Sequence, residues 1–120
     1  MFFWFNRRKR KKLEEFLQRS SMSHEEFLQE INFSAEVFVI KCYRVKLGEM
    51  FLLPSKNIYP NDSFDEISQF AFSDWDILEI ILFLEEILAI ALDEDNTPEW
   101  TPGKTVGPWI KDLLLRCSLQ

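Results

Sequence analysis

The chain of 120 residues is long enough for one domain with a modest hydrophobic core. Its hydrophobic content of 47% is that of a packed protein rather than a disordered one. Only three glycines and five prolines are present, which argues against a many-turned β-sandwich or barrel and favours helices. The net charge of −6 disfavours nucleic-acid binding by the body of the protein, because phosphate repels acidic surfaces.

Charge is unevenly distributed along the chain. Residues 1–19 hold seven basic side chains against two glutamates, a net charge of +5, whereas the remaining 101 residues hold seven basic and eighteen acidic side chains, a net charge of −11. We therefore predict a basic amino-terminal extension and helix, residues 1–32, attached to an acidic helical bundle, residues 33–120. An acidic body suits a protein partner with a basic patch.

The amino terminus places an apolar, aromatic-rich cluster, residues 1–5, before the basic run Arg7 to Lys12. A secretory signal has the opposite order, and the cluster is too short to span a membrane. Three interpretations of residues 1–12 stay open. The segment is a tail that docks on the body or on a second copy, a weak contact with anionic membranes, or a nucleic-acid-binding arm.

Apolar spacing predicts helix from Leu13 to Ile31 in two pieces, broken around residues 20–21. The second piece begins with the capping-box pattern of Ser23 and Glu26. His24 is the only histidine, and no catalytic or metal-binding motif surrounds it. We interpret it as an exposed surface side chain.

A further helix is predicted from Ser34 to Gly48, capped by the first of these residues and ended by the second. The partial alternation of Ile40 to Leu47 also suits a strand, so both states are considered, and helix is preferred because a lone strand has no evident partner. A long connection follows over residues 49–72. The side chains expected to pin it to the core are Ile58, Tyr59, Phe64 and Ile67.

The segment from Ser73 to Asp95 predicts an unusually apolar helix with a capping serine at its start. Its acidic residues are Asp74, Asp76, Glu79, Glu85 and Glu86. Three explanations are open for the surplus of apolar side chains: a dimer contact, a groove for a partner, or deep burial beneath the amino-terminal helix, which is the simplest.

The carboxyl-terminal part begins with a turn-rich segment, residues 93–103. Asp93, Asp95 and Thr97 have the first spacings of a calcium loop, but Pro98 replaces the glycine that such a loop needs. No metal site is therefore predicted.

Thr105 predicts the cap of a final helix, residues 107–117. The apolar face of this helix comprises Trp109, Ile110, Leu113 and Leu114. Cys42 and Cys117 lack metal-ligand spacing, and we expect reduced thiols, the first of them buried.

The apolar helix resembles the second helix of acyl carrier proteins, which opens with Asp-Ser-Leu-Asp, continues with an aliphatic-Glu-aliphatic triplet and reaches Leu-Glu-Glu. When the two patterns are aligned on Leu84-Glu85-Glu86, Asp76 matches the second aspartate and Glu79 the glutamate. The serine that carries phosphopantetheine in that family then falls on Asp74, and Ser73 lies one position before it.

The resemblance extends over about residues 34–116. The elements that recur in the family's first loop appear here in the same order, as Leu47-Gly48, Ile58, Pro60-Asn61-Asp62 and Ser63-Phe64. The chain departs from the family by a longer segment after Phe64 and by lacking the Asp-Leu-Gly that precedes the modified serine. Residues 1–33 have no counterpart.

This resemblance implies an all-α fold, a small four-helix bundle like an acyl carrier protein, with an extra basic, helical amino-terminal extension. A carboxylate at Asp74 cannot form the family's phosphodiester. We therefore predict a non-enzymatic carrier-like or adaptor protein without a cofactor, similar to bacterial acyl-carrier-like proteins that lack the serine. The predicted location is the cytoplasm, with a peripheral position at the inner membrane as an alternative. The residues predicted to bind the partner are Asp74, Asp76, Glu79 and Glu86.

Two other functions stay open. The chain is a genuine acyl carrier with 4′-phosphopantetheine on Ser73, or it is a helical interaction protein such as an immunity factor. No nucleophilic triad, phosphate-binding loop, nucleotide fingerprint or zinc spacing is present in the sequence, so an enzyme is not predicted. A homodimer is compatible with all of these functions.

Overall fold

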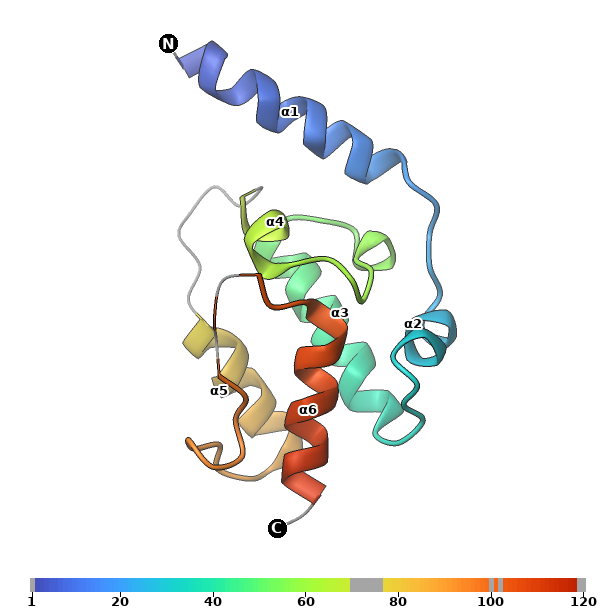
Figure 1. Cartoon of the computed structure of the whole chain (residues 1–120), viewed down its shortest axis with the longest axis vertical. Helices are drawn as coiled ribbons and strands as arrows, with labels where there is room; N and C mark the ends of the chain where they lie inside the picture. The colour runs from blue at the N-terminus through green and yellow to red at the C-terminus, as the bar shows by residue number, and fades with distance from the viewer. Residues whose placement is uncertain (1, 70–76, 100, 102, 119–120) are drawn as a thin grey trace.

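The computed structural model describes residues 2–69, 77–99, 101 and 103–118 (Figure 1). In these ranges the chain is helical, without β-strands beyond one isolated bridge between Ser63 and Thr105. The elements are α1 (Phe2–Gln18), α2 (His24–Glu30), α3 (Val37–Phe51), the 3-10 turn η1 (Ser55–Asn57), α4 (Phe64–Ser68), α5 (Ile77–Leu88) and α6 (Val106–Ser118). The prediction of a small all-α bundle is confirmed.

The body is built around α3, which packs against α2, η1 and α5 (Figure 1). Tyr43 on α3 stacks on Trp109 of α6, with ring centroids 6.2 Å apart, and the edge of Phe64 meets the same indole at 5.9 Å. The Tyr43 hydroxyl also donates to the Val106 carbonyl at 2.9 Å. This aromatic cluster joins α3, α4 and α6. Fully buried apolar side chains around it include Phe27, Leu47, Phe51, Ile80, Leu84, Ile110 and Leu113.

The amino-terminal region forms two helices with a break between them, as predicted, but α1 begins at Phe2 rather than Leu13. No glycine or proline interrupts residues 2–18, and Arg, Lys, Leu, Glu and Gln are strong helix formers. The capping box of α2 is confirmed, since Ser23 Oγ accepts from the Glu26 N–H at 3.1 Å and the Glu26 carboxylate accepts from the Ser23 N–H at 3.1 Å. The core also includes Phe16, so α1 and α2 both contribute to it. The division of the chain into an extension, residues 1–32, and a bundle, residues 33–120, stays a prediction.

Residues 37–51 form a helix, not a strand, but both predicted ends are wrong. The residues that flank the helix are Glu36 and Leu52, which have positive φ angles of 52° and 59°. Gly48 lies inside α3 instead of ending it. A Cβ atom there would lie 2.6 Å from the Leu53 carbonyl oxygen, so the glycine allows the chain to fold back over the helix.

The long connection contains the last residues of α3, the η1 turn and α4. Ile58, Phe64 and Ile67 are buried as predicted, whereas Tyr59 is half-buried. Ser63 caps α4 by accepting from a backbone N–H in the first turn at 3.1 Å. The connection is therefore a structured part of the body.

The α5 helix ends at Leu88, well before the predicted end at Asp95. Ala89 takes a left-handed conformation with φ 57°, which stops the helix. The following turn is held by Asn96, which is 1% exposed and donates to the Ala91 carbonyl at 3.1 Å. The turn-rich segment is thus confirmed.

The apolar face of α6 is buried as predicted, and the helix runs from Val106 to Ser118. Cys42 and Cys117 are free thiols, and both are half-buried. None of the described helices combines the length and the apolar composition needed to cross a membrane.

Candidate functional site

The residues predicted to bind a partner or a cofactor divide into two groups. Ser73, Asp74 and Asp76 lie outside the described residues. Glu79 and Glu86 belong to α5, and both side chains are exposed. Of the predicted site, the structure therefore describes only the part on the outer face of α5.

The two faces of α5 differ in burial. Ile80 and Leu84 are fully buried in the core. Leu78 and Leu82 lie one turn apart and are 52% and 55% exposed. Because α1 is attached at the opposite end of the body (Figure 1), it does not cover α5, and the explanation by deep burial beneath the amino-terminal helix is wrong for these leucines.

The carboxylates of α5 have different surroundings. Glu79 Oε1 lies 3.5 Å from Lys46 Nζ of α3, and their side chains are 56% and 22% exposed. The same ammonium lies 5.5 Å from the ring centroid of Phe83. Glu85 accepts from the Leu92 backbone N–H at 2.8 Å and so supports the end of the helix.

Glu86 differs from both, because no ion-pair partner for it is found among the described residues. Its negative charge is therefore available to a partner, whereas the charge of Glu79 is partly neutralised. The exposed acidic residues that follow α5 are Asp93, Glu94, Asp95 and Glu99. In the part of the chain that the structure describes, no group of His, Cys, Asp and Glu is arranged to hold a metal ion.

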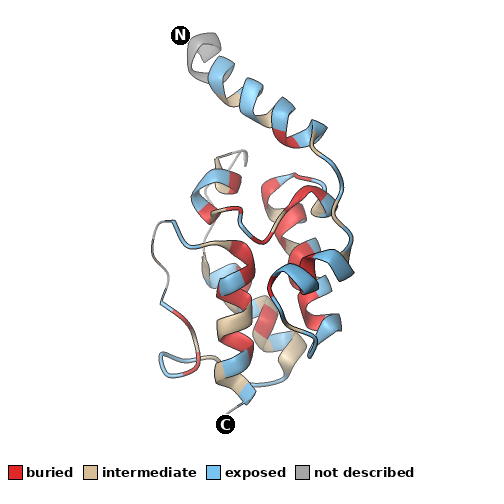
Figure 2. Cartoon of the chain, turned by 45° about the vertical axis from the view of Figure 1, so that its right-hand side comes forward, coloured by how far each residue is buried: buried red, intermediate tan, exposed pale blue. Residues whose placement is uncertain are grey.

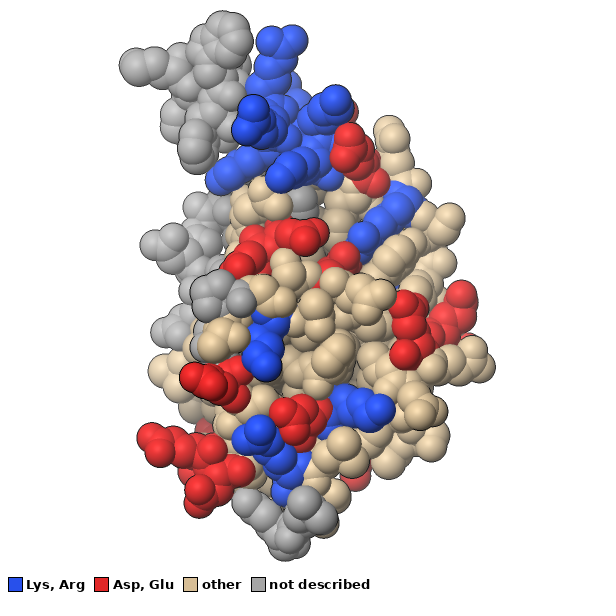
Figure 3. Space-filling view, viewed as in Figure 1, with Lys and Arg blue, Asp and Glu red and all other residues tan. Residues whose placement is uncertain are grey.

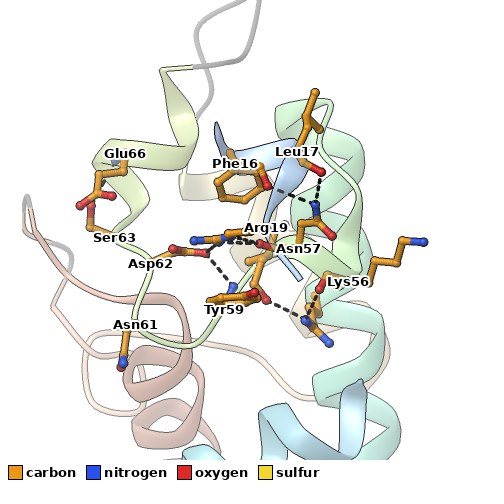
Figure 4. Close-up of polar contacts among 12 residues, drawn as sticks. Phe16, Leu17, Arg19, Lys56, Asn57, Tyr59, Asn61, Asp62, Ser63 and Glu66 are labelled. Carbon is orange, nitrogen blue, oxygen red and sulfur yellow. Dashed lines mark hydrogen bonds and ion pairs between the residues drawn. The ribbon is translucent and has the colours of Figure 1, made fainter. Parts of the chain in front are cut away.

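A second polar cluster, which sequence reasoning missed, joins α1 to the connection between η1 and α4 (Figure 4). Arg19 Nε donates to the Asn57 carbonyl at 2.9 Å, and the guanidinium also forms an ion pair with Asp62. The cation lies between two rings, 3.9 Å from the centroids of Phe16 and Tyr59. We call Arg19, Asn57, Tyr59 and Asp62 the clamp.

The clamp also satisfies the backbone at the end of α1. The Asn57 side chain donates to the carbonyls of Phe16 and Leu17 at 3.2 and 3.1 Å, in the last turn of α1, where helix carbonyls commonly accept from outside donors. The Tyr59 hydroxyl donates to the Ser20 carbonyl. Asp62 accepts from the Tyr59 N–H at 2.6 Å, which fixes the carboxylate beside Arg19.

A buried cation lies next to the clamp. Arg44 of α3 is fully buried and donates to the carbonyls of Ile58 at 2.9 Å and Lys56 at 3.1 Å. Its guanidinium lies 4.7 Å from the Phe27 ring centroid. Burial lowers the pKa of Arg44 to about 10, against the opposing effect of nearby carboxylates, so the side chain stays charged at neutral pH.

His24 is half-buried against this cation, so the prediction of an exposed surface histidine is wrong. Its Nδ1 lies 3.3 Å from the Arg44 guanidinium and must accept, because arginine can only donate. Burial and the positive charges of Arg44 and Lys41 lower the pKa of His24 below 6.5. The neutral imidazole thus belongs to a structural network.

Comparison of the chain with protein-family models, characterised proteins and solved structures found no match. The resemblance to acyl carrier proteins therefore stays a prediction.

Proposed function

We propose that the chain is a non-enzymatic, carrier-like adaptor that binds a protein partner through the outer face of α5. The observation that carries this proposal is the pairing of two exposed leucines, Leu78 and Leu82, with the exposed carboxylates Glu79 and Glu86 on one short helix. An apolar centre with charged neighbours is the usual make-up of a protein interface.

The helix order supports a carrier-like role. The helix α3, a long connection, the apolar helix α5 and the final helix α6 follow one another along the chain, an order that the resemblance to acyl carrier proteins implies. Asp74 at the aligned attachment position argues against the usual cofactor, because a carboxylate cannot take the serine's place in the phosphodiester. The partner should offer an apolar pocket surrounded by Lys or Arg.

The partner can be identified and tested with matched variants. Immobilised wild-type protein and the variants Leu82→Ser and Glu86→Lys should be compared for quantitative capture from lysate of the source cell. Leu115→Ser, at 46% exposure on α6, and Glu30→Lys, on α2, provide the same chemical changes elsewhere.

A protein lost with both α5 variants and retained with both controls should then bind the purified chain directly. Binding should weaken with salt for the wild type and less steeply for Glu86→Lys. If every captured protein responds equally to the α5 variants and the controls while circular dichroism stays helical, the face of α5 is not the binding site.

A further inference from the structure

The α1 helix projects from the body (Figures 1 and 2). It contains 17 residues, about 25 Å of helix at 1.5 Å per residue. Phe16 in its last turn is buried, whereas most described side chains nearer the amino terminus are exposed. The molecule is 51 Å long but only 27 and 21 Å across, and α1 forms one end of it.

This projecting end is strongly basic. Figure 3 shows a cluster of Lys and Arg side chains at this end, whereas acidic and further basic side chains are scattered over the rest of the visible face. The exposed basic residues of this cluster are Arg7, Arg8, Arg10, Lys11 and Lys12. The acidic turn after α5 lies towards the other end of the molecule.

The clamp fixes the direction in which α1 projects. Asn57 donates to the carbonyls of Phe16 and Leu17 in the last turn of the helix, and Arg19, directly after the helix, donates to the Asn57 carbonyl. Just beyond it, the Met22 backbone N–H donates to the Lys56 carbonyl at 2.8 Å, so the linker to α2 is attached to the body as well. The basic cluster is therefore presented by an ordered attachment.

This arrangement places the positive charge of the basic cluster and the negative charge of the acidic turn after α5 towards opposite ends of the molecule. An anionic surface attracts the basic cluster and repels the acidic body. Screening limits both effects to about 8 Å at physiological salt, a small part of the 51 Å long axis. A flat anionic surface can therefore contact the cluster while the acidic turn after α5 stays beyond its field.

We propose that α1 binds the surface of anionic membranes and holds the body away from them. The apolar, aromatic-rich residues 1–5 precede the basic run with only Asn6 between them, and this composition suits the boundary between headgroups and acyl chains. Duplex nucleic acid would use the basic residues, and its stacked base pairs offer no such apolar layer. In this arrangement the outer face of α5 remains accessible to a partner.

The test uses the full chain and sedimented vesicles of phosphatidylcholine with 0, 15 and 30% phosphatidylserine. Bound protein should increase with the phosphatidylserine fraction and decrease as salt is raised. A basic residue near such a surface contributes about a fivefold factor in partitioning, so the double variant Arg10→Ala/Lys11→Ala should bind about twenty-five-fold more weakly.

The control Lys41→Ala/Lys104→Ala removes two exposed basic residues from the body, so it has the same net charge as the α1 variant and should bind like the wild type. Equal binding to vesicles without phosphatidylserine, absence of binding, or equal losses in both double variants would overturn the proposal. So would binding to duplex DNA at the same salt that is tighter than binding to the most anionic vesicles.

Discussion

Replacing Asn57 with alanine should loosen the attachment of α1 to the body. The side chain is 4% exposed and donates two hydrogen bonds, to the carbonyls of Phe16 and Leu17. Each such bond contributes about 0.5–1.5 kcal/mol net, so the two together contribute about 1–3 kcal/mol. We expect the lower part of this range, because water can reach the Leu17 carbonyl once the amide is removed.

The loss should be measured by urea unfolding, by thermal unfolding and by amide hydrogen exchange. A chain of 120 residues has an unfolding entropy of about 250 cal/mol/K, so 1–3 kcal/mol corresponds to a decrease of about 4–12 °C in Tm. Exchange should accelerate most in the last two turns of α1. Asn61→Ala removes an exposed asparagine whose amide donates to Glu30 at 3.3 Å, and it should change stability by less than about 0.5 kcal/mol.

Asn57→Leu separates hydrogen bonding from packing, because leucine keeps most of the volume without a donor. It should be at least as destabilising as Asn57→Ala. If leucine restores wild-type stability, the side chain acts through volume. If Asn57→Ala and Asn61→Ala are indistinguishable in unfolding and in exchange, the amide does not hold α1 and the clamp has been misassigned.

Two further predictions concern titration and modification. Burial and Arg44 lower the pKa of His24 below 6.5, so the unfolded chain binds this proton more readily, and the free energy of unfolding should decrease as pH falls from 6.5 through the folded pKa. His24→Asn keeps an acceptor and should remove this slope in urea unfolding, whereas an unchanged slope would exclude His24 as its source. Incubation with coenzyme A and a broad-specificity pantetheinyl transferase should leave the intact mass unchanged, and a gain abolished by Ser73→Ala but not by Asp74→Ala would establish a genuine carrier.

Structural features that depend only on residues close together in the sequence can be predicted from local sequence patterns. The capping box at Ser23 and Glu26 was predictable because both partners lie within one turn. The buried face of α6 was predictable because Trp109, Ile110 and Leu113 recur with helical spacing. In both cases the stabilising contact is either local or set by a simple apolar stripe.

Features that depend on distant parts of the chain were not predictable in this way. The sequence pattern predicts Gly48 as a helix end, but in the structure its missing side chain lets the backbone at Leu53 pack closely against α3. The clamp joins Arg19 to Asp62, which are 43 residues apart, and no motif in the sequence connects them. The burial of Arg44 does have a local signal, since this residue falls between Ile40 and Leu47 on the core face of α3 and so occupies an apolar position.

The apolar residues of α5 show why composition alone was misleading there. Of the three explanations for the surplus of apolar side chains, burial beneath the amino-terminal helix is the simplest, yet Leu78 and Leu82 are about half exposed. Burying the rest of each side chain in a partner would contribute about 1 kcal/mol, roughly half the value for a full leucine. A rim ion pair from Glu79 or Glu86 would contribute about 0–1 kcal/mol, and Glu79 must first exchange its contact with Lys46. The leucines should therefore set how long a partner stays bound, while Glu86 mainly sets how fast it arrives.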